Sequence, residues 1–192
     1  MEKFQNIYRI PSARASFWDY RCRAEYFVTI CTYNQFSYFG EIKNREMILS
    51  EIGKVVHTEW LKTFEMRPDM NLYMGEFVIM PNHFHAIIGI GENKYNEEQY
   101  VMNHSDASRD AMHCVSIDNA KNQFGPQSKN LSSIIRGFKS GVTKNARIID
   151  QDFAWQTRFY DHIIRNDKSY NNIMEYIAEN PLNWEKDKFY VE

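Results

Sequence analysis

Two histidines separated by a single residue, His83 and His85, are the side chains whose types and spacing point most directly to chemistry. They open a β-branched run that follows Pro81 and Asn82. Because successive side chains of a strand alternate between its faces, both imidazoles should lie on one face and Phe84 on the other. Two imidazoles on one face form half of a metal site; two partly exposed polar residues at a strand start are the alternative interpretation.

A tyrosine and an amide, Tyr176 and Asn180, lie four residues apart in a predicted helix over residues 169–180. This spacing places both on one helix face, at the edge of an apolar stripe. The helix should end at Asn180, since proline at position 181 disfavours helical geometry in the preceding residue. Tyr176 can therefore reach into a cleft, and a core tyrosine with its hydroxyl at the rim is the alternative.

The remaining patterns predict the elements that must position these side chains. Ser50 is a plausible N-cap for an amphipathic helix of about four turns. Residues 131–147 predict a second helix with an apolar face and a basic face. The predicted strands are 26–32, 38–42 as its hairpin partner, 72–80, 83–90 and 159–164. This order favours an α+β fold, with helices packed on one face of an antiparallel sheet.

Composition indicates one soluble globular domain over residues 1–192, with a hydrophobic content of 43%. No apolar run approaches the roughly 20 residues of a membrane span, so no membrane partner is expected. Three cysteines without CxxC spacing, and no apolar N-terminal signal, favour the cytoplasm. Residues 1–25 are expected to form a basic N-terminal arm, and the polar residues 91–130 a surface insertion.

The net charge of -2 hides two basic segments. Residues 3–23 carry five basic residues and one acid, and residues 129–147 carry five basic residues and no acid. Such local charge can follow a phosphate backbone, and aromatic rings can stack on unpaired bases. A solvated surface is the alternative interpretation of both segments. Together with the family resemblance described next, they imply a DNA-binding groove between the arm and the second helix, with DNA contacts at Arg14, Trp18, Arg136, Lys139 and Lys144.

Several ordered motifs resemble those of a known family, the REP-associated tyrosine transposases within the single-tyrosine HUH transposases. The resemblance covers nearly the whole chain except residues 91–130. The motifs are Trp18-Asp19-Tyr20, YFVTICT at 26–32, MPNHFH at 80–85, LSSIIRGFKS at 131–140, Trp155-Gln156, YDHIIR at 160–165 and YIAENPL at 176–182.

The resemblance implies a ferredoxin-like antiparallel sheet backed by helices. It makes His83 and His85 the metal ligands, Asn180 the third protein ligand and Tyr176 the nucleophile. The implied substrate is single-stranded or hairpin DNA containing repetitive extragenic palindromes, cleaved and rejoined through a covalent 5′-phosphotyrosine. Members of this family are commonly monomers, whereas related insertion-sequence transposases are dimers, so we expect a monomer and leave a dimer open.

A tyrosine phenol, with an ordinary pKa near 10, needs a Lewis acid to attack a phosphodiester at neutral pH. Nitrogen and oxygen ligands suit Mn²⁺ and Mg²⁺. One alternative is a non-catalytic protein that binds DNA hairpins on the same fold. A metal-dependent phosphodiesterase without a covalent intermediate is disfavoured, because it gives no reason for the placement of Tyr176. Tyr160 is the reserve nucleophile.

Overall fold

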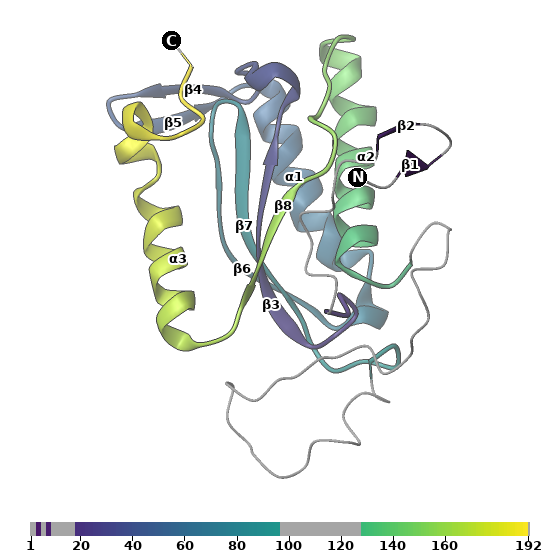
Figure 1. The fold of residues 1–192 in the computed structure, drawn as a ribbon. Coiled ribbons are helices and arrows are strands. Elements are labelled where there is room, and N and C mark those ends of the chain that lie inside the picture. Colours follow the sequence, from purple (N-terminus) through teal and green to yellow (C-terminus); the bar gives the residue numbers. More distant parts are fainter. Residues whose placement is uncertain (1–2, 5–6, 9–17, 97–127, 192) are drawn as a thin grey trace.

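A computed structural model describes residues 3–4, 7–8, 18–96 and 128–191 (Figure 1). The strands are β1 (Lys3–Phe4), β2 (Ile7–Tyr8), β3 (Ala24–Cys31), β4 (Gly40–Lys43), β5 (Glu46–Leu49), β6 (Leu72–Ile79), β7 (His83–Ile90) and β8 (Tyr160–Ile164). The helices are α1 (Glu51–Glu65), α2 (Leu131–Ile149) and α3 (Asp167–Glu179), with short 3₁₀ turns η1 (Tyr33–Gln35), η2 (Pro68–Met70) and η5 (Pro181–Lys186).

The main sheet has four antiparallel strands in the order β6-β7-β3-β8. Along the chain its elements run β3, α1, β6, β7, α2, β8, which is the βαββαβ succession of a ferredoxin-like fold. The predicted α+β class with an antiparallel sheet is thus confirmed. β3 and β7 occupy the two central positions, so the histidine pair at the start of β7 lies inside the sheet rather than at an edge.

The predicted pairing of strand 26–32 with residues 38–42 is wrong. β4 pairs instead with β5 in a separate hairpin, in which Lys43 lies opposite Glu46. The two residues between them, Asn44 and Arg45, both have positive φ, as a two-residue hairpin turn requires. β3 is buried along most of its length and pairs with β7 on one side and β8 on the other. The shorter β4 has only four residues and is half-exposed, so it could not cover an edge of β3 in the same way.

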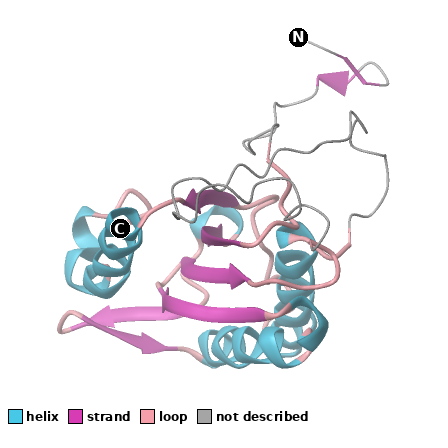
Figure 2. Cartoon of the chain, turned by 90° about the horizontal axis from the view of Figure 1, so that it is seen from below, coloured by secondary structure: helices cyan, strands magenta, loops and turns pink. Residues whose placement is uncertain are grey.

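The two faces of the main sheet carry different layers. Helices α1 and α2 pack together on one face, as predicted for the two helices of the ferredoxin-like unit. Helix α3 lies on the opposite face, so the expectation that all helices share one face fails for this element (Figure 2). The reason is the apolar stripe of α3, which packs on the second face of the same strands through Tyr170, Ile173 and Ile177.

Local signals place the two larger helices as the sequence predicts. The Ser50 hydroxyl accepts a hydrogen bond of 3.0 Å from the Gly53 amide and begins α1. Asn130 and Ser133 form a reciprocal capping box at the start of α2. Trp60 of α1 is fully buried and its ring contacts Phe84 of β7 and Phe138 of α2, which joins both helices to the sheet.

Most of the predicted arm and insertion lies outside the described residues. At their inner ends the chain is packed into the domain: Tyr20 and Cys22 are buried, and the Asn96 amide donates to the carbonyl of Arg21. Within the described ranges, none of the helices is both long and apolar enough to span a membrane.

Candidate active site

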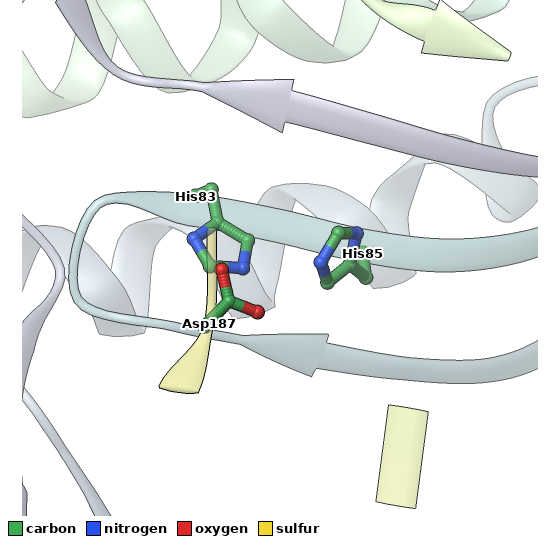
Figure 3. Close-up of side chains that lie close together, drawn as sticks. All are labelled: His83, His85 and Asp187. Atoms are coloured by element: carbon green, nitrogen blue, oxygen red, sulfur yellow. The ribbon is translucent and has the colours of Figure 1, made fainter. Parts of the chain in front are cut away.

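His83 and His85 lie at the start of β7 and project from one face of the strand, beside Asp187 (Figure 3). This is the face of the sheet on which α3 packs. Both side chains are almost completely buried, and their ring centroids are 4.5 Å apart. Phe84 between them points into the apolar layer under α1 and α2. The alternation predicted from the sequence therefore holds, and the alternative of two partly exposed polar residues does not fit.

The neighbouring Asn82 fixes the tautomer of His83. Its amide nitrogen donates to the carbonyls of Gln35 and Phe189, at 3.2 and 2.8 Å, so its oxygen is left as an acceptor. That oxygen lies 2.9 Å from Nδ1 of His83, which must carry the proton. The Nε2 lone pair then faces the site, where the atom is buried without a hydrogen-bond partner among the described residues.

His85 is held between β3 and α3. Its Nδ1 lies 2.8 Å from the Thr29 hydroxyl, across the β3–β7 pair. Its Nε2 lies 3.2 Å from the hydroxyl of Tyr176. The Tyr176 ring also meets the Phe27 ring edge-on, so an apolar side chain from β3 supports the phenol.

Asn180 completes the predicted set. It is buried at the C-terminal end of α3, one turn beyond Tyr176. Its amide nitrogen donates to Asp187, at 3.2 Å, which leaves its oxygen as a buried acceptor without a partner among the described residues. A divalent cation fits these orphaned atoms: they are nitrogen and oxygen donors with lone pairs available, and no described cysteine is among them.

Asp187 is a member of the site that sequence reasoning missed. One carboxylate oxygen of Asp187 and one nitrogen of each histidine all lie within 4.8 Å of one another. The Tyr176 hydroxyl also donates to Asp187, at 3.4 Å. Asp187 reaches the histidines because η5 turns the chain back over them and the Phe189 ring packs 4.6 Å from that of His83. No spacing distinguishes Asp187 from the eight other acids of residues 150–192.

Burial controls the charge of the site. It lowers the pKa of His83 to about 3, with a smaller contribution from the positive charge of Lys188. Burial also lowers the pKa of His85 well below its ordinary value, and the neighbouring His83 adds to this effect. Both imidazoles are therefore neutral at pH 7, the form that binds a metal. Burial, followed by the charge of Asp187, raises the pKa of Tyr176.

The expected DNA contacts are not gathered around this site. Arg14 lies outside the described residues. Trp18 packs against the core and donates to the Tyr26 hydroxyl at 3.1 Å. Arg136 and Lys144 are exposed on α2, behind the opposite face of the sheet.

Lys139 differs from the expectation of a solvent-facing cation. Its ammonium group donates to the carbonyls of Gln156 and Arg158, at 2.7 and 3.0 Å, and so braces the segment before β8. The pKa of Lys139 is lowered to about 8, because the group is partly buried.

A cavity of about 480 Å³ adjoins the tyrosine. Its lining includes His85 and Tyr176, together with Tyr160 and His162 of β8. Tyr160, the reserve nucleophile, is exposed, and among the described residues it is Tyr176 that hydrogen-bonds His85.

The fold and the site define a ferredoxin-like α+β protein in which two strand histidines face a tyrosine and an amide on a following helix. No family model matches the chain. An uncharacterized protein of Haemophilus influenzae is 37% identical over 190 residues, 97% of this chain and 96% of that protein. A second protein of the same organism, assigned by name to the REP-associated tyrosine transposases, is 30% identical over 104 residues, 54% of this chain and 46% of that protein.

A solved structure, that of a REP-associated tyrosine transposase bound to a REP hairpin, matches with a TM-score of 0.54. It is 19% identical in sequence, and the match covers 93% of this chain and 77% of that one. The similarity shows the fold. The resemblance to the REP-associated tyrosine transposases is thus confirmed, in sequence over half of the chain and in fold over nearly all of it.

Proposed function

We propose that this protein is a single-tyrosine HUH transposase, which cleaves and rejoins single-stranded or hairpin DNA of the REP type. The observation that carries the proposal is the hydroxyl of Tyr176, 3.2 Å from Nε2 of His85. Near it, Nε2 of His83 and the side-chain oxygen of Asn180 are buried without hydrogen-bond partners among the residues that the structure describes. The transposase that shares the fold is bound to a REP hairpin, which supports the choice of substrate.

The proposed metal ligands are Nε2 of His83, Nε2 of His85 and the side-chain oxygen of Asn180, with Asp187 as an additional oxygen donor. When bound there, Mn²⁺ or Mg²⁺ would neutralise the non-bridging oxygens of the scissile phosphate. All four residues belong to a single chain, so the site needs no second copy and we propose that the protein acts as a monomer.

The proposed step uses Tyr176 as the nucleophile. Its oxygen forms a bond to phosphorus, the bond from phosphorus to the 3′ oxygen breaks, and the leaving oxygen takes up a proton to become a 3′-hydroxyl. Asp187, which accepts a hydrogen bond from the phenol, is placed to receive the phenolic proton. The phosphotyrosine linkage conserves the energy of the broken diester, so attack by another 3′-hydroxyl can rejoin the strand.

The test is incubation of the protein with labelled hairpin DNA and Mn²⁺ or Mg²⁺, followed by denaturing electrophoresis. We expect a covalent protein–DNA band in the parent and its loss in Tyr176→Phe and His83→Ala. His57→Ala is the matched control, because His57 is exposed on α1, which packs on the face of the sheet opposite the histidine pair. A band that survives Tyr176→Phe would contradict the assignment, and its loss in Tyr160→Phe instead would favour the reserve nucleophile.

The same experiment separates the non-catalytic alternative. A protein that only holds hairpins would shift the labelled DNA in a native gel without ever forming the covalent band, with either metal. This outcome would replace the enzyme by a hairpin-binding module on the same fold.

A further inference from the structure

Two neighbouring cavities follow β8 and the start of α3. The first, of about 480 Å³, begins at His85 and Tyr176. The second, of about 380 Å³, extends to Tyr20 and Arg165. Both are lined by His162, Asn166 and Ser169, so the two cavities adjoin each other along β8 and the start of α3. We call this pair of cavities the β8–α3 groove.

The lining of the groove has the chemistry of a single-strand binding surface. Tyr160 offers an aromatic ring on the sheet face and is 52% exposed. The exposed polar side chains of His162 and Asn172 stand over the same space. Lys168 and Lys188 supply positive charge, and the Lys188 ammonium lies 5.9 Å from the centre of the Tyr160 ring. Proteins that bind single-stranded nucleic acid stack unpaired bases on aromatic rings and hold the phosphate backbone with nearby cations.

The position of the groove decides its occupant. A strand attacked by Tyr176 has to place its phosphate at the phenol, and its flanking nucleotides must leave along a surface that touches this point. The β8–α3 groove starts there, whereas α2 with its exposed Arg136 and Lys144 packs on the other face of the sheet. The size of the first cavity suits a ligand of one or two nucleotides rather than a duplex.

We propose that the β8–α3 groove binds the unpaired nucleotides next to the scissile phosphate, with one base stacked on Tyr160. His162 and Asn172 lie beside this base and contact its edge, and Lys168 and Lys188 hold the phosphates on either side. This inference rests on the proposed function of Tyr176, and it assigns Tyr160 to substrate binding instead of nucleophilic attack.

The test measures binding without cleavage, in the Tyr176→Phe protein. The probe is a REP-type hairpin oligonucleotide with a single-stranded flank, in which 2-aminopurine replaces one flank base at a time. We expect fluorescence quenching at one or two flank positions, as the base stacks on a ring. Adding Tyr160→Ala should abolish the quenching and weaken binding roughly 5- to 100-fold, whereas Tyr160→Phe should retain both.

Tyr33→Ala is the matched control, because Tyr33 is exposed to the same degree, 53%, and lines neither cavity. It should leave quenching and affinity unchanged. Equal effects of Tyr160→Ala and Tyr33→Ala, or no position with quenching, would overturn the proposal. Loss of the covalent band in Tyr160→Phe would overturn it as well, since the hydroxyl would then be needed for chemistry.

The two proposals fail in different ways. If the parent protein never forms the covalent band but the position-specific quenching depends on Tyr160, the groove stands and catalysis by Tyr176 falls. If the band forms and the flank shows no dependence on Tyr160, the catalytic assignment stands and the groove assignment falls.

Discussion

The same two strands, β3 and β7, build two chemically different surfaces. Toward α1 and α2 they present Val28, Ile30, Phe84 and Ala86, all packed into one apolar cluster. Toward α3 the residues in between include Thr29, His83 and His85. Their polar atoms contact one another, Asn82 or Tyr176, except for Nε2 of His83, which has no hydrogen-bond partner in the part of the chain that the structure describes. Adjacent residues of these two strands therefore belong alternately to the core and to the candidate active site.

The difference shows how a buried polar site is kept in place. The apolar face holds the strands in position through burial, which is worth roughly 25 cal/mol per Å² of apolar surface. The other face then carries imidazoles that are almost completely buried, although burying polar groups opposes folding. Phe27, Ile87 and Ile164 anchor α3 at one end of that face, and the polar residues occupy the other end.

The largest expected effect tests the apolar face. Phe84→Ala should lower the free energy of unfolding by about 3–5 kcal/mol, because it removes a buried ring that contacts Trp60 and Phe138. Urea unfolding measures the loss. Its neighbour in sequence is the control: His85→Ala should abolish Mn²⁺ binding, measured by calorimetry, at a smaller cost in stability. If Phe84→Ala instead abolished Mn²⁺ binding and His85→Ala caused the larger loss of stability, the assignment of one face to the core and the other to the site would be wrong.

The second prediction concerns pH in the absence of metal. The folded protein holds His83 at a pKa of about 3 against an ordinary 6.5, so between these values the unfolded chain binds more protons. Stability should therefore fall as pH drops below 6.5, by about 2 kcal/mol from this group between pH 7 and pH 5. Urea titrations in EDTA measure it. His83→Gln should reduce the slope, and an unchanged slope would count against burial of a neutral imidazole.

The third prediction concerns the residue that orients His83. Asn82→Ala removes the acceptor for Nδ1 of His83 and should weaken Mn²⁺ binding roughly 10- to 100-fold, as for other residues that hold a ligand in place. Calorimetry provides the affinity. Asn93→Ala is a matched control, since Asn93 is also buried and hydrogen-bonded but lies beside Met70 and Gly91. Equal losses in both variants would indicate a general structural effect.

The smallest effect is expected when a polar and an apolar side chain are exchanged at two adjacent residues of β3, which face opposite sides of the sheet. Thr29→Val removes the hydroxyl beside Nδ1 of His85 and should weaken Mn²⁺ binding about tenfold. Val28→Thr places a hydroxyl in the apolar cluster and should cost about 1–3 kcal/mol of stability with no change in metal affinity. Calorimetry and urea unfolding on both variants show whether the faces are as independent as the structure indicates.

Much of the fold could be predicted because its signals are local. The Ser50 cap, the strand at 83–90 and the helix predicted over 131–147 follow from hydrogen bonds and periodicities within a few residues, and the observed helix extends only two residues further. The partner of β3 could not be predicted in this way. Its strand pattern fits a hairpin with residues 38–42 as well as the observed pairing with β7 and β8, and only packing of the whole sheet selects between them.

The candidate site divides along the same line. The sequence by itself determined that His83 and His85 share a face and that Tyr176 and Asn180 share another, because strand and helix geometry fix side chains two and four residues apart. Tertiary structure decided that α3 crosses to the face opposite α1 and α2, that the two pairs meet, and that Asp187 joins them. These contacts join segments about 90 to 100 residues apart in the chain. Burial of apolar surface brings the segments together, and because this driving force is non-directional, no spacing of residues in the sequence reveals it.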